Sequence, residues 1–252
     1  MLKENGASNV SLGTEREMAA DIAFQRSKVY KLFSSLFSFP ERELFEFLKS
    51  GGLLNEIRKA FRIIPPAPPF IKERRKGSIL DHLGRATEKF SSLNLKDLQE
   101  GYAGIFETPG KRCALYEANY LDFPQEEMAD IAGFYNAFGF KFEERPDHLG
   151  AELEFLHLLT MKEAKAVFSG EEKRVELCMD GERKFLSTHP GRWVEAMAEN
   201  IKEREGLPYF RFASALAGWL RAEAQYLGLT LETVKASRMR EMFHDGFVAC
   251  DS

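Results

Sequence analysis

The stretch "FEERPDHLGAELEFLHLL", Phe142 to Leu159, carries the strongest structural signal in this 252-residue chain. Its apolar residues recur three and four positions apart, which predicts an amphipathic helix. The buried face of that helix is expected to contain Leu149, Leu153, Leu156, Thr160, Ala164 and Val167. Asp147 stands where an N-cap residue would, because its carboxylate can accept from the amides of the first turn. His148 and Glu152 share one side of the helix, at the border of the buried face.

The segments on either side of this helix also have helical spacing, and they are separated by glycine and proline. Thr14 and Glu17 form a capping-box pattern that predicts the start of the first helix. Pro40 is expected to open the second helix, and Gly139 to cap the helix that precedes the quoted stretch. No strand or hairpin pattern is visible. We therefore predict a flexible N-terminus over residues 1–13 and a single all-α domain of about ten helices over residues 14–252.

Composition and charge exclude several classes of protein. The net charge of −4 disfavours nucleic acid as a partner, since such partners normally require a basic face. Eighteen apolar residues never occur in succession, so no membrane insertion is expected. The N-terminal residues lack the apolar core of a signal peptide. Cys113, Cys178 and Cys250 are odd in number and far apart, which favours a reducing compartment. The expected location is the cytoplasm.

Two Glu-x-x-His pairs raise the possibility of a metal enzyme. Glu154 precedes His157 by three residues, and Glu241 precedes His244 by the same interval. Two such pairs on facing helices, with two further glutamates, can form a carboxylate-bridged di-iron site. Glutamate is common in this chain, however, and Gly246 places the second pair near a helix end. Coincidence is the preferred interpretation, and no metal, cofactor or catalytic residue is predicted.

Three blocks of sequence together resemble one family. The first is "GIFETPGKRCALYEANYL" (residues 104–121), with a Pro-Gly, a Tyr-Glu and a second Tyr. The second is "FYNAFGFKFEERPDHLGAELEFLHLL" (134–159), whose P-D-H-L-x-x-E-L-E-F run is the most specific element. The third combines "KFLSTHPGRWVEAMAENI" (184–201) with "PYFRFASALAGWL" (208–220). The chain resembles the TorD-like chaperones, also called the DmsD and NarJ group, which mature molybdenum oxidoreductases.

The resemblance implies a role without catalysis. Such chaperones bind the twin-arginine leader and the apo form of a molybdopterin oxidoreductase of the DMSO reductase type, and delay its export until the cofactor is inserted. The implied partners are this leader, the apo-oxidoreductase subunit and the proteins that deliver the molybdenum cofactor. A homodimer could form by domain swapping, since long helices joined by the Pro-rich hinge at residues 63–70 can exchange.

A receptor for paired arginines needs carboxylates beside an apolar groove. Asp147, Glu152 and Glu117 are expected to supply the charge, and His148 to tune the site or donate a hydrogen bond. The aromatic faces are expected from Tyr116, Tyr120 and Phe123. Three alternatives stay open: a NarJ-type chaperone that assembles a nitrate reductase-like complex, a di-iron carboxylate enzyme, and a helical adaptor whose binding does not depend on paired arginines.

Overall fold

The computed structural model describes residues 5–65, 76–107, 114–122, 124–141, 145–201 and 208–235. Regular structure within these ranges is helical, apart from one isolated antiparallel bridge between Tyr116 and His148. The predicted all-α class is therefore confirmed. The first half of the chain contains α1 (Asn5–Leu36), α2 (Arg42–Lys49), α3 (Gly52–Ile63), α4 (Ile79–Lys89), α5 (Leu95–Tyr102) and the π-helical turn η1 (Ala103–Glu107). The remaining elements are the 3-10 turn η2 (Glu117–Asn119), α6 (Pro124–Phe138), α7 (Leu149–Ser169), α8 (Glu172–Thr188), α9 (Pro190–Ile201) and α10 (Tyr209–Tyr226).

Helix boundaries agree with the sequence pattern where glycine decides them. Gly139 has φ +68° and follows the last residue of α6, as predicted, because glycine adopts the left-handed conformation without strain. Two predicted helix starts are wrong. α1 begins at Asn5, so the Thr14–Glu17 pair lies inside the helix, in a stretch that no proline interrupts. α2 begins at Arg42 rather than at Pro40.

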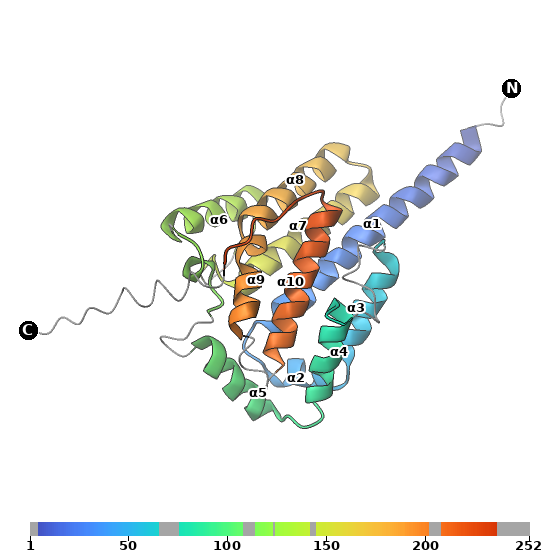
Figure 1. Ribbon diagram of the computed structural model, residues 1–252. Coiled ribbons are helices and arrows are strands. Elements are labelled where there is room, and N and C mark those ends of the chain that lie inside the picture. Colours follow the sequence, from blue (N-terminus) through green and yellow to red (C-terminus); the bar gives the residue numbers. More distant parts are fainter. Residues whose placement is uncertain are drawn as a thin grey trace, which may run out of the picture.

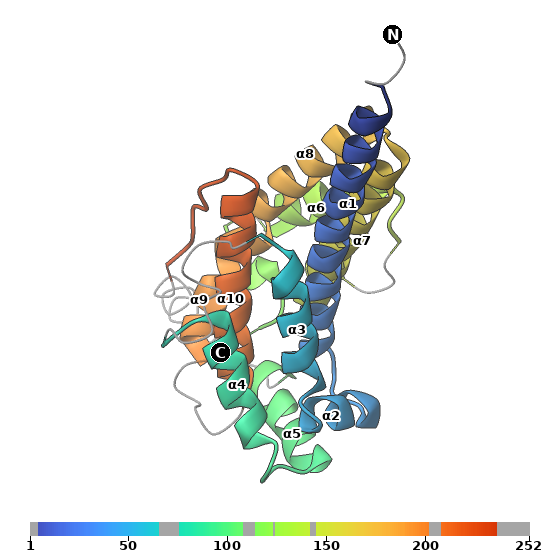
Figure 2. The same ribbon diagram turned by 90° about the vertical axis from the view of Figure 1, so that its right-hand side faces the viewer.

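The longest helices form the centre of the molecule. α1 packs along α7 more extensively than any other two helices pack together, and α8 lies against α7 (Figure 1). α10 packs between α9 and α4, and α3 joins α4 to α1 (Figure 2). The N-terminal end of α1 projects beyond the body of the molecule in both views. In the part of the chain that the structure describes, no helix is both long and apolar enough to cross a membrane.

One continuous hydrophobic core draws side chains from every α-helix in the described residues, α1 to α10. Trp193 and Trp219 are among its largest fully buried members, as their helical spacing among apolar neighbours predicts. The predicted face of α7 is buried from Leu149 to Ala164, and only Val167 is partly exposed. Cys178 is a free, buried thiol on α8, whereas Cys113 and Cys250 lie outside the described residues.

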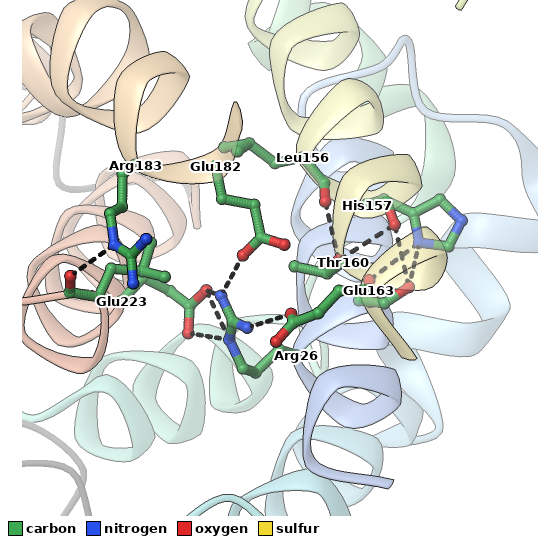
Figure 3. Close-up of polar contacts among 10 residues, drawn as sticks. Arg26, Leu156, His157, Thr160, Glu163, Glu182, Arg183 and Glu223 are labelled. Carbon is green, nitrogen blue, oxygen red and sulfur yellow. Dashed lines mark hydrogen bonds and ion pairs between the residues drawn. The ribbon is translucent and has the colours of Figure 1, made fainter. Parts of the chain in front are cut away.

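A buried ion-pair cluster joins four helices at the centre of the molecule. Arg26 of α1 is fully buried and contacts Glu163 of α7, Glu182 of α8 and Glu223 of α10 at 2.7, 2.6 and 2.8 Å (Figure 3). The Arg26 guanidinium also lies over the ring of Tyr226. Because each partner belongs to a different helix, this one side chain ties α1 to the rest of the core.

The residues after α10 turn back beside α9. The amide of Val234 donates to the carbonyl of Arg192 at 2.9 Å. Leu231 packs so closely on Gly191 that a Cβ there would lie 2.8 Å from a Leu231 methyl and 2.3 Å from the Leu186 carbonyl. Glycine is therefore required at the corner between α8 and α9, which also positions His189.

Candidate functional site

The loop before η2 is attached to the start of α7 by backbone hydrogen bonds. The amide of Leu149 donates to the carbonyl of Leu115 at 2.7 Å, and the amide of Glu117 donates to the carbonyl of Asp147 at 2.9 Å. These bonds flank the bridge between Tyr116 and His148. The two blocks that carry the predicted site residues are thus side by side.

The N-cap of α7 is His148, not Asp147. Nδ1 of His148 accepts from the amide of Gly150 at 3.1 Å. The predicted capping role of Asp147 is therefore wrong by one residue. The reason is that the Asp147 side chain turns toward η2, where one of its oxygens accepts from the amide of Ala118 at 3.3 Å.

Asp147 is buried and holds an arginine of its own chain. Arg145 donates from Nε and Nη2 to the two oxygens of this carboxylate, at 3.0 and 2.7 Å. The same guanidinium lies 4.5 Å from the centre of the Tyr116 ring. Tyr116 in turn meets His148 edge to face, with ring centres 5.2 Å apart. Asp147 and Tyr116 therefore already form a two-sided guanidinium site, and half of the Arg145 side chain is exposed (53%).

Glu117 and Glu152 are fully buried behind this junction, in one polar cluster. Oε2 of Glu152 accepts from the indole of Trp193 at 3.2 Å, and Oε1 of Glu117 lies 3.1 Å from Nδ1 of His189. Burial raises the pKa of Glu152 well above its ordinary value, and the neighbouring Glu117 raises it further. Oε2 of Glu117 and Oε1 of Glu152 accept no hydrogen bond from an N–H group of the described residues. A proton on Glu152 allows the two carboxyl groups to share a hydrogen bond, which satisfies these oxygens.

The remaining predicted aromatic residues differ in their placement. Tyr120 is buried, stacks on Trp193 with ring centres 4.9 Å apart, and donates to the carbonyl of Ala114 at 2.9 Å. It supports the loop from inside. Phe123 lies outside the described residues.

A surface groove of about 720 Å³ opens over the junction. Its lining includes Lys31, Ser34, Glu107, Tyr116, Phe140, Lys141, His148 and Glu154. Of the predicted site residues, Tyr116 and His148 line this groove, whereas Asp147, Glu117 and Glu152 are buried behind it. Ser34 closes the floor by donating to the carbonyl of Gly150 at 3.0 Å.

A second, more apolar groove of about 380 Å³ continues from the first. It lies between the end of α1 and helices α2 and α3, and its lining includes Leu32, Leu36, Leu44, Phe47 and Leu53. Ser38 and Phe39 line both grooves. We call the two together the α1 groove; it offers a polar half and an apolar half in succession.

The first Glu-x-x-His pair is occupied by contacts with α1. Glu154 accepts from Nζ of Lys31 at 2.8 and 2.9 Å. Nδ1 of His157 lies 2.7 Å from the hydroxyl of Ser27. Glu241 and His244 lie outside the described residues. The geometry of the first pair does not support the di-iron alternative.

Three polar residues of the structure were not singled out from the sequence. Arg145 occupies the predicted arginine acceptor, Arg26 organises the core, and His189 belongs to the buried cluster. A charged residue within an apolar helical face, as Arg26 is, could have indicated a buried ion pair. The roles of Arg145 and His189 depend on contacts that local spacing does not reveal.

These features define an all-helical protein with a surface groove beside the start of α7. Sequence comparison is specific: the chain belongs to the family described as nitrate reductase delta subunit, which it matches over residues 74–199. This membership confirms the resemblance to NarJ- and TorD-like chaperones.

Curated relatives have the names of assembly chaperones. The chain is 27% identical over 198 residues to the perchlorate reductase assembly chaperone protein of Dechloromonas aromatica (strain RCB), covering 75% of this chain and 84% of the relative. It is 28% identical over 145 residues to the selenate reductase assembly chaperone protein of Thauera selenatis, covering 54% and 74%. It is 24% identical over 207 residues to the chlorate reductase assembly chaperone protein of Ideonella dechloratans, covering 79% and 88%. The relatives are chaperones rather than catalysts, as the sequence predicts for this chain.

Proposed function

We propose that this protein is a cytoplasmic maturation chaperone that binds the twin-arginine leader and the apo form of a molybdopterin oxidoreductase. It holds the client back from export until the cofactor is inserted. The names of the three relatives, each an assembly chaperone for a reductase, support this function. The absence of a strongly basic composition is consistent with a protein client rather than nucleic acid.

The contact of Arg145 with Asp147 and Tyr116 is the observation that carries the proposal. A buried carboxylate with both oxygens directed at one guanidinium, and an aromatic face beside it, is the arrangement that recognises arginine. Because Arg145 is half exposed, a client arginine can replace it without unfolding the loop. Glu107 and Glu154 in the same groove provide acceptors for the second arginine of a pair, with Lys31 retained on Glu154.

The apolar half of the α1 groove supports the direction of binding. A leader carries an apolar stretch after its arginines. With the arginines at Tyr116 and His148, that stretch can lie along Phe39, Leu36 and Phe47. Burial of such side chains adds affinity that does not depend on sequence detail.

The proposal is tested with two synthetic peptides that share one apolar stretch, preceded by Arg-Arg in the first and Ala-Ala in the second. Charge-assisted hydrogen bonds are worth about 1.5–3 kcal/mol each, so calorimetry should show at least a tenfold weaker affinity for the Ala-Ala peptide. Part of the difference should disappear at high salt. Equal affinities would favour the helical adaptor.

Two variants locate the arginine acceptor. Asp147→Asn removes the charged two-oxygen acceptor and should weaken binding of the Arg-Arg peptide. Arg145→Ala vacates the acceptor and should strengthen binding. The matched control is Arg174→Ala, which removes an exposed arginine paired with Glu171 on α8, away from the groove. If neither Asp147→Asn nor Arg145→Ala changes the affinity, the arginines bind elsewhere.

Membership of the nitrate reductase delta subunit family favours one second candidate. In this NarJ-type role, the protein assembles a nitrate reductase-like complex and binds a client N-terminus that lacks paired arginines. The apolar half of the α1 groove would then supply most of the affinity. Substitution of Leu36 or Phe47 by Ala should in that case weaken binding of both peptides alike.

A further inference from the structure

His189 lies at the corner between α8 and α9 and faces α6 with one ring nitrogen. Its side chain is fully buried, against the rings of Phe134 and Phe185. Glu127 and Asp130 are three residues apart on α6 and so project from the same side of that helix. Their side chains are 20% and 57% exposed, so these carboxylates lie between the buried imidazole and the solvent.

The buried carboxylate of Glu117 orients the imidazole. Oε1 of Glu117 lies 3.1 Å from Nδ1 of His189, and a carboxylate can only accept. The Nδ1–H of His189 therefore donates to Glu117, which in the neutral imidazole leaves the lone pair on Nε2. A histidine held in this way by a carboxylate is the usual arrangement behind a metal-binding imidazole.

Nε2 of His189 makes no hydrogen bond with the residues that the structure describes, although it is buried. Oδ2 of Asp130 lies 3.3 Å away, but outside the direction in which an N–H would donate. Two ligand atoms that share a tetrahedral ion at about 2 Å are themselves about 3.3 Å apart, and neither points at the other. Glu127, Glu117 and His189 each offer an atom within 4.8 Å of the others.

The charge around this position favours a cation. Glu117, Glu127 and Asp130 surround one imidazole, and among the described residues Arg192 is the cation that meets them, with Nη1 2.9 Å from Oε1 of Glu127. One guanidinium leaves the carboxylates with excess negative charge. Arg192 also donates to the carbonyl of Thr188, so it can remain in place beside a second cation.

We propose that Nε2 of His189 and the carboxylate of Asp130 bind a divalent first-row metal ion, with zinc the best fit. Glu127, which has a carboxylate oxygen within 4.8 Å of a ring nitrogen of His189, turns onto the ion as the third ligand. Glu117 fixes the imidazole from behind. Water completes the coordination beside Asp130, whose side chain is 57% exposed. The ion links α6 to the corner between α8 and α9. Its ligands belong to neither Glu-x-x-His pair. This site does not depend on the proposed leader binding.

The test uses the full chain, stripped with a chelator and titrated with Zn²⁺ and with Co²⁺. Calorimetry should show one Zn²⁺ per chain, and Co²⁺ should give the visible absorption of a four-coordinate site. Saturating Zn²⁺ should also raise the melting temperature, because the ion binds only the folded chain. No binding of either ion at micromolar concentrations would overturn the proposal.

Variants of the exposed ligands keep the test independent of folding. Asp130→Asn and Glu127→Gln should each weaken Zn²⁺ binding at least tenfold, while the melting temperature without metal stays close to that of the wild type. The matched control Asp180→Asn changes an exposed aspartate on α8 that pairs with Arg183, and it should bind Zn²⁺ as the wild type does. Equal binding by all three variants would place the ion elsewhere and overturn the assignment. Affinity for the Arg-Arg peptide is measured separately on the stripped protein, so failure of one proposal leaves the other standing.

Discussion

At the start of α7, the sequence pattern assigns both helix capping and arginine binding to Asp147, whereas the structure uses two neighbouring residues. His148 caps the helix through Nδ1, and Asp147 uses its carboxylate on Arg145 and on η2. Both side chains have oxygen or nitrogen acceptors of suitable reach, so residue type alone cannot decide between them. The antiparallel bridge to Tyr116 decides, because it fixes the direction in which each side chain leaves the backbone.

Replacement of the cap gives the first prediction. His148→Ala should lower the free energy of unfolding by about 1 kcal/mol, since the amide of Gly150 loses its acceptor. His148→Asn should recover most of this loss, because an amide oxygen can accept in the same position. Urea denaturation of the three proteins checks both statements. An equal loss in the two variants would instead assign the effect to the contact between the His148 and Tyr116 rings.

The sequence predicts which blocks meet at the site, but not which side chains reach the surface. Tyr116 and His148 line the groove. Glu117 and Glu152 lie in the same two sequence blocks and are also polar, but both are buried. Their burial depends on Trp193 and His189, which come from distant parts of the chain. Such pairing is decided by tertiary packing and leaves no local pattern.

At the scale of elements, α8 is attached to the core through a carboxyl group with an unusual pKa. Burial raises the pKa of Glu182 to about 8, and the ion pair with Arg26 at 2.6 Å only partly opposes this, because Glu163 and Glu223 are also close. The unfolded chain releases this proton near pH 4.5, the ordinary value. The contribution of Glu182 to stability is therefore fully present below about pH 4.5 and is lost as the pH rises toward 8.

The second prediction follows from this loss of stability with rising pH. Glu182→Gln cannot ionise, so the decrease in unfolding free energy between pH 5 and pH 8 should be smaller in this variant than in the wild type. Glu176→Gln, an exposed position on the same helix, should leave the decrease unchanged. Chemical denaturation at several pH values provides the measurement. A steeper decrease in Glu182→Gln than in the wild type would contradict the assigned direction.

Helix boundaries show the same division between local and distant causes. Gly139 adopts a positive φ where α6 ends, and the sequence predicts this point well. The start of α1 is missed because a capping-box pattern is meaningful only where a helix begins. Inside a continuous helix the same two residues are simply neighbours on its surface.

For the molecule as a whole, Arg26 is the residue that joins four helices, α1, α7, α8 and α10, through one side chain. Arg26→Ala leaves three buried carboxyl groups without their common cation, and removal of one partner from a buried ion pair costs about 3–5 kcal/mol. The third prediction is a loss of this size in unfolding free energy. Lys31→Ala, which removes an exposed ion pair from the same helix, should cost about 1 kcal/mol or less. Comparable losses in the two variants would show that the buried cluster contributes little.

The Arg26 cluster also constrains the order of events during synthesis. Its partners Glu163, Glu182 and Glu223 follow it by 137, 156 and 197 residues. A nascent chain emerges N-terminus first, so α1 leaves the ribosome long before the last of these carboxylates exists. Pairings so distant in sequence also slow folding, because a long loop must close before the contact is gained. A chaperone built in this way reaches its own native state only after nearly all of it has been translated. Until then, Arg26 lacks its ion-pair partners, although it lies on the side of α1 that is buried in the folded protein.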